Sequence, residues 1–169
     1  THVLITDTRG KVMDIIRHPE AGDDVQQLPG ILTPGFVNCH CHIELSHLRN
    51  RIPPGTGLTG FIAAVMKFPP FSREEKDAAM QEADLEMYQN GITAVGDISN
   101  QPYSLMQKIK SPLRWHSFLE ITNLDDALAA GRLEKFQAMQ MQFKNALPSM
   151  ASTFSPHAIY SLSPQTFRL

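Results

Sequence analysis

Short runs of β-forming residues alternate with segments of helical character over most of this sequence. Strands are expected at residues 35–38, 92–96, 114–120 and 152–155. Helices are expected at residues 73–90, 101–111 and 125–147, and from residue 164 onward. Strands that alternate with helices form βαβ units, in which the strands run parallel in one sheet. The sequence therefore predicts an α/β fold.

Titratable side chains close every expected strand. His40 and His42 follow the first strand, Asp97 the second, Glu120 the third and His157 the fourth. In parallel α/β folds the carboxyl ends of the strands meet on one face, where the loops build the active site. Because no glycine-rich phosphate loop follows the first strand, a (β/α)8 barrel is favoured over a nucleotide-binding doubly wound sheet.

The four consecutive residues Cys39-His40-Cys41-His42 suggest a metal site, but they cannot all bind one ion. Side chains alternate along a strand, so the two histidines are expected on one face and the two cysteines on the other, packed behind them. Zinc sites that use both residue types also space their ligands differently. What remains is a His-x-His pair at the end of a strand.

The segments around this core are less regular. Residues 2–6 and 11–16 are expected to form a hairpin within a separate N-terminal part, residues 1–33. The Pro- and Gly-rich residues 49–60 and the apolar stretch 61–66 predict a long loop with a single helical turn.

Composition limits the partners. The chain has 169 residues and a formal net charge of −2, and its basic residues are scattered, so no surface for nucleic acid or anionic membranes is expected. No apolar run is long enough to span a membrane. The two cysteines are too close together on one strand for a structural disulfide, which favours a cytoplasmic protein.

Three motifs resemble the amidohydrolase superfamily, in its deaminase and chlorohydrolase branch that includes adenosylhomocysteine and aminofutalosine deaminases. "PGFVNCHCH" at residues 34–42 resembles the first barrel strand of that family, "GITAVGDIS" at 91–99 its second, and "SPHAIYSLSP" at 155–164 its fourth. The resemblance implies that residues 34–169 are the first four β-α units of a metal-dependent hydrolase barrel. It also implies that residues 1–33 are part of a small β-sandwich, with the hairpin at its edge.

The resemblance further implies a function. His40 and His42 would bind one ion, Zn²⁺ or Fe²⁺, since the strand at 152–155 has no lysine to bridge two metals. The implied reaction is deamination of a purine-like or other nitrogen heterocycle by a metal-bound hydroxide. The acid/base glutamate and the remaining metal ligands are expected beyond Leu169. The implied substrate-binding residues are His157, Glu44, Asp97, Asn100 and Glu120, although capping or salt bridging is an alternative for Asp97, Asn100 and Glu120.

Other functions remain open at this point. Chloride or a ring amide would replace ammonia as the leaving group in a chlorohydrolase or a cyclic-amide hydrolase of the same fold. As a 169-residue product, the chain would be an inactive fragment or a half-barrel that needs a partner. Open strand edges favour association, so a homodimer through these edges is one such arrangement.

Overall fold

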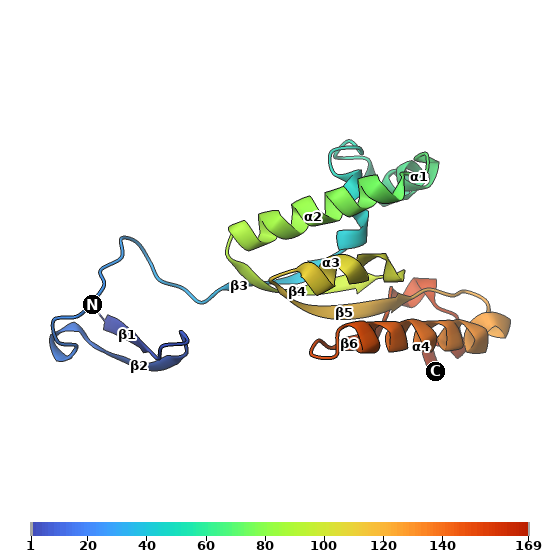
Figure 1. Ribbon diagram of the computed structural model, residues 1–169. Coiled ribbons are helices and arrows are strands. Elements are labelled where there is room, and N and C mark those ends of the chain that lie inside the picture. Colours follow the sequence, from blue (N-terminus) through green and yellow to red (C-terminus); the bar gives the residue numbers. More distant parts are fainter. Residues whose placement is uncertain (1, 169) are drawn as a thin grey trace. The chain divides into compact units, whose positions relative to one another are not determined.

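The computed structural model describes residues 2–168, which form two compact units at residues 2–34 and 35–168 (Figure 1). The first unit is an antiparallel hairpin of β1 (His2–Thr6) and β2 (Val12–Arg17), followed by a 3-10 turn, η1 (His18–Glu20). The Asp7 carboxylate accepts two backbone N–H groups of the hairpin turn, and Gly10 takes a left-handed φ of 78°. The hairpin is confirmed, whereas its place in a β-sandwich stays a prediction.

The second unit contains a four-stranded parallel sheet, as the sequence predicts. Its strands are β3 (Phe36–Cys41), β4 (Ile92–Ser99), β5 (Arg114–Ile121) and β6 (Ser152–Pro156). They are paired in the order β3-β4-β5-β6, so each strand lies beside the next one in the chain. β4 runs three residues past its expected end, which places Asp97 inside the strand and leaves Asn100 to follow it.

Each of these strands is followed by at least one helix. The α-helices are α1 (Gly57–Lys67), α2 (Arg73–Gln89), α3 (Leu105–Lys110), α4 (Ala129–Ala146) and α5 (Pro164–Arg168). Four 3-10 turns lie between them and the strands: η2 (Ile43–Leu48), η3 (Pro102–Ser104), η4 (Asp126–Leu128) and η5 (Ile159–Ser161). A capping box starts α2, because the side chains of Ser72 and Glu75 each accept the other's backbone N–H.

The prediction of a loop with one helical turn at residues 49–66 is wrong, because α1 has 11 residues. The two prolines that suggested a loop, Pro53 and Pro54, lie before the helix. Gly55 and Gly57 have φ values of 81° and 66°, and this left-handed backbone turns the chain into α1. The prolines and Gly55 therefore precede the helix, and Gly60 is accommodated inside it.

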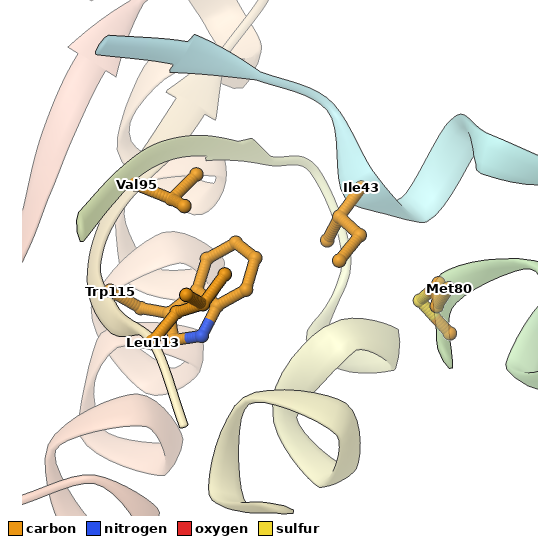
Figure 2. Close-up of a cluster of buried hydrophobic side chains, with 5 residues drawn as sticks. All are labelled: Ile43, Met80, Val95, Leu113 and Trp115. Carbon is orange, nitrogen blue, oxygen red and sulfur yellow. The ribbon is translucent and has the colours of Figure 1, made fainter. Parts of the chain in front are cut away.

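α2, α3 and α4 lie on one face of the sheet (Figure 1). Two clusters of buried side chains form the core between them. The first consists of Ile43, Met80, Val95, Leu113 and Trp115, and the second of Leu119, Phe136, Met139 and Phe143. Figure 2 shows the first cluster, in which Ile43 comes from the segment after β3 and Met80 from α2.

Successive side chains of β5 point alternately into this core and to the opposite face of the sheet. Trp115 and Leu119 are buried under the helices, whereas His116 and Glu120 are only half-buried. The functional side chains described below lie on the face of His116 and Glu120, at the carboxyl ends of the strands. Within residues 2–168, no helix combines the length and the apolar character that crossing a bilayer requires.

Candidate functional site

The His-x-His pair lies at the end of β3, as expected. The rings of His40 and His42 meet edge to face, with their centroids 5.1 Å apart. His40 is exposed and His42 half-buried. Burial lowers the pKa of the His42 imidazole, which favours the neutral ring that binds metal ions. The Nδ1 atom of His42 is buried and has no hydrogen-bond partner among the described residues.

The two cysteines do not share one environment, which corrects the prediction that both pack behind the histidines. Cys41 packs against the first core cluster, but Cys39 is exposed. The pairing of β3 with β4 is irregular between Asn38 and Cys41, which breaks the strict alternation on which the prediction rested. β3 is also an edge strand of the sheet.

Gly96 on β4 has a role that sequence reasoning missed. A Cβ atom built on it would lie 2.7 Å from the Cys39 carbonyl oxygen, closer than side-chain atoms normally approach. β4 therefore passes directly against the irregular part of β3 that leads into the histidines. Any larger residue at position 96 would push this segment outward.

Four of the expected substrate-binding residues form one hydrogen-bonded chain. The Glu44 carboxylate accepts the backbone N–H of Asn100 at 3.1 Å, and the Asn100 amide donates to Glu120 Oε2 at 2.9 Å. Glu120 Oε1 in turn lies 2.9 Å from His157 Nδ1. The chain thus links η2, the end of β4, the end of β5 and the residue after β6.

Glu44 is the most perturbed member of this chain. Burial raises the pKa of its carboxyl group to about 7, and its Oε2 atom is buried without a partner within residues 2–168. A buried carboxyl oxygen without a partner is costly, so such an atom commonly marks a place where a ligand donates a hydrogen bond. His157, at the other end of the chain, is exposed.

Asp97 does not belong to this chain, which corrects the expectation that it lines the pocket. Its side chain is fully buried on the opposite face of the sheet, in an ion pair with Lys108 of α3, with Oδ2 and Nζ 2.6 Å apart. Side chains two positions apart on a strand lie on the same face, so Asp97 points toward the helices together with Val95 and Ser99. Salt bridging, the alternative held open above, is the observed role.

Lys108 was missed by the sequence analysis. It is fully buried, and its burial lowers the pKa of its ammonium group although Asp97 raises it. One signal could have found it: Lys108 lies three residues after Leu105, on the same face of a short helix. A lysine on the apolar face of a helix and an aspartate inside a buried strand together predict a buried ion pair.

The residues present fit a metal ion in part. The neutral His42 ring with its buried, unpartnered Nδ1 atom and the adjacent His40 ring are suitable imidazole ligands. Among residues 2–168, however, no three His, Cys, Asp or Glu side chains are grouped so that they could hold a metal. These two histidines can therefore supply two ligands of a larger set.

The cysteines offer a simple check of this geometry. Burial, followed by the charge of Asp97, raises the pKa of the Cys41 thiol to about 12, and the thiolate is the reactive form. We expect iodoacetamide at about pH 8 to alkylate Cys41 at least ~100-fold more slowly than the exposed Cys39, as followed by mass spectrometry. In denaturant the two rates should converge, and equal rates in the folded chain would contradict the assigned burial.

Comparison with known proteins gives consistent matches. A family model described as "Amidohydrolase family" matches residues 31–168. The adenosine deaminase of Helicobacter pylori is 27% identical over 136 residues, which are 78% of this chain and 32% of that protein. The aminodeoxyfutalosine deaminase of a Nitratiruptor species is 23% identical over 134 residues, 77% of this chain and 33% of that protein. The chain spans about a third of the length of these curated relatives.

Solved structures give the same fold. Helicobacter pylori aminofutalosine deaminase, in a crystal structure with methylthio-coformycin, superposes with a TM-score of 0.68 at 21% identity, over 94% of this chain and 39% of that one. A second crystal structure of that enzyme superposes with a TM-score of 0.63 at 24% identity, over 79% of this chain and 30% of that one. The α/β fold therefore resembles amidohydrolase barrel proteins, and four parallel strands are consistent with half of a barrel.

Proposed function

The chain belongs to the amidohydrolase family, and from this membership we propose that it forms the N-terminal half of a metal-dependent hydrolase that deaminates a nitrogen heterocycle. The observation that carries the proposal is the hydrogen-bonded chain from Glu44 to His157 beside the His40–His42 pair. The relatives named above are deaminases, which supports the choice of leaving group.

In this proposal His40 and His42 hold one divalent ion together with ligands from outside these 169 residues. The amidohydrolase family generally uses a divalent metal, and Zn²⁺ or Fe²⁺ suits imidazole ligands. Such an ion would supply Lewis-acid activation of water.

The residues of the chain bind and orient the heterocycle. The free Oε2 atom of Glu44 is suited to accept a hydrogen bond from a ring N–H or a sugar hydroxyl when the carboxyl group is ionised. His157 is exposed and presents its ring from a fixed direction, because Glu120 binds its Nδ1 atom. Asn100 and Glu120 hold these two groups at a constant separation rather than contact the reacting atoms.

The function is tested by assaying the full-length protein encoded by the gene, loaded with Zn²⁺ or Fe²⁺, for ammonia release from adenosine-type nucleosides, guanine and pterins. Metal-dependent release of ammonia from at least one of them would support the proposal. Release of chloride from a chlorinated heterocycle, or ring opening of a cyclic amide without ammonia, would replace deamination by the corresponding activity. The 169-residue chain, assayed in parallel, is expected to release none.

Replacement of His157 tests whether it contacts substrate or metal. Loss of a charge-assisted or buried hydrogen bond typically costs about 1.5–3 kcal/mol, so His157→Ala should lower kcat/KM by roughly 10- to 200-fold. Metal content, measured on the same preparation of the full-length protein, should stay at the wild-type level. If metal is lost together with activity, His157 is a ligand and the single-ion assignment is wrong.

A further inference from the structure

A buried group of charged and hydroxyl side chains lies under the sheet, on the face opposite the candidate site. The Lys108 ammonium group contacts three oxygen atoms: Asp97 Oδ2 at 2.6 Å, Ser117 Oγ at 2.8 Å and Ser99 Oγ at 3.1 Å. An ammonium group has three N–H donors, so all of them are used. None of these four residues is more than 2% exposed, and none can meet a substrate directly.

Asp97 connects this group to the candidate site. Its Oδ2 atom takes the ion pair and a hydrogen bond from Ser99 at 2.9 Å. Its Oδ1 atom accepts the backbone N–H of Ile43 at 2.8 Å. Ile43 is the residue that follows His42, and it is itself fully buried (Figure 2). The peptide that leaves His42 is therefore held by a carboxylate from the neighbouring strand.

The surroundings keep that carboxylate in place. The Lys108 Nζ atom lies 5.5 Å from the centre of the Trp115 ring and 5.1 Å from that of Phe143, so one aromatic ring of each core cluster flanks the cation. A group bonded at every polar atom and enclosed by rings has few alternative positions. The Asp97 carboxylate is thus fixed relative to the whole sheet.

We propose that Asp97, held by Lys108, is a positioning residue that fixes the backbone after His42 and thereby aims the His40–His42 pair. The inference rests on the proposed metal-binding role of these histidines. β3 needs such a support, because it is an edge strand and its pairing with β4 is irregular at the histidines. Support of this kind around ligating residues typically changes metal affinity by roughly 10- to 100-fold.

The test separates the hydrogen bond to Ile43 from the buried charge. In the full-length protein, Lys108→Met is combined with either Asp97→Asn or Asp97→Leu, so that both double variants lack the ion pair and have side chains of similar size. Only the asparagine variant retains an oxygen that can accept the Ile43 N–H. Affinity for Co²⁺ alone is measured from its visible absorption bands in competition with a chelator.

We expect the Asp97→Leu double variant to bind Co²⁺ roughly 10- to 100-fold more weakly than the Asp97→Asn one. Asp84→Leu is the matched control, because Asp84 of α2 is also a buried carboxylate but its partners within residues 2–168 are Gln107 and Ser111. It should leave affinity within about twofold of wild type. Equal affinities of the two double variants would overturn the proposal.

Hydrogen exchange of the Ile43 amide provides a readout that does not depend on metal. It should be at least ~10-fold faster in the Asp97→Leu double variant than in the Asp97→Asn one, and unchanged by Asp84→Leu. If the wild type binds no Co²⁺, the proposed function fails while this exchange still tests whether Asp97 holds the backbone. If exchange is the same in both double variants, the positioning role is wrong whatever the metal result.

Discussion

Replacement of either His40 or His42 by alanine in the full-length protein is expected to weaken Zn²⁺ binding by more than ~100-fold. Removing a residue that only supports a metal ligand lowers metal affinity by up to about 100-fold. Removing the ligand itself should lower it further. Each variant removes one of two imidazoles whose rings lie 5.1 Å apart on the same strand end. Metal content after dialysis and Co²⁺ titration are the measurements.

The adjacent cysteines provide the controls for this experiment. Cys39→Ala and Cys41→Thr change the neighbouring positions of the same strand, and both should retain metal at the wild-type level. Cys41 points into the core and Cys39 is exposed away from any cluster, so neither is placed to complete the ligand set. Equal loss of metal in a cysteine variant would show that a thiolate is a ligand.

Lys108→Met on its own is expected to lower the free energy of unfolding of the metal-free protein by about 3–5 kcal/mol. Removal of one partner of a buried ion pair leaves the other charge without compensation, and that penalty exceeds the value of the pair itself. Here the remaining Asp97 carboxylate would be fully buried and would keep Ser99 and the Ile43 N–H as donors, with no positive charge to balance it. Chemical denaturation measures the change.

The Lys108→Met/Asp97→Asn double variant distinguishes a charge effect from a packing effect. Since no charge remains buried, it should recover at least half of the loss, in line with the small cost of replacing both members of a buried pair. Arg73, which pairs with Asp77 on the surface of α2, is the exposed comparison, and Arg73→Met should cost less than about 1 kcal/mol. A double variant as unstable as Lys108→Met would mean that the methionine side chain does not fit.

Apart from α1, the sequence predicted the order of strands and α-helices in the second unit because its signals are local. The Ser72–Glu75 capping box, the Asn90-Gly91 stop and the apolar spacing of residues 133–147 depend on neighbouring residues only. The members of the hydrogen-bonded chain were found for a related reason, since the carboxyl ends of parallel strands always share one edge. That all four are joined in a single chain depends on side-chain orientation, which no local pattern contains.

The errors at Asp97 and Cys39 came from interactions between distant parts of the chain. Asp97 was expected on the open face because strand β4 was ended too early, and only the ion pair with Lys108 makes a carboxylate tolerable under the helices. Cys39 was expected to be packed, but the irregular pairing of β3 with β4 depends on the approach of Gly96. Both features require knowledge of which strand lies beside which.

The single chain from Glu44 to His157 also constrains how such a site can change. The side chains of Asn100, Glu120 and His157 are bonded directly to one another, so the energetic effects of substitutions at these three positions should be coupled rather than additive. Replacing the Asn100 side chain would release the Glu120 carboxylate, whereas Glu44 would keep its hydrogen bond to the backbone N–H of residue 100. Divergence toward a new heterocycle at this edge therefore proceeds by concerted replacement of Asn100, Glu120 and His157, whereas Glu44 can be exchanged with less effect on the other three.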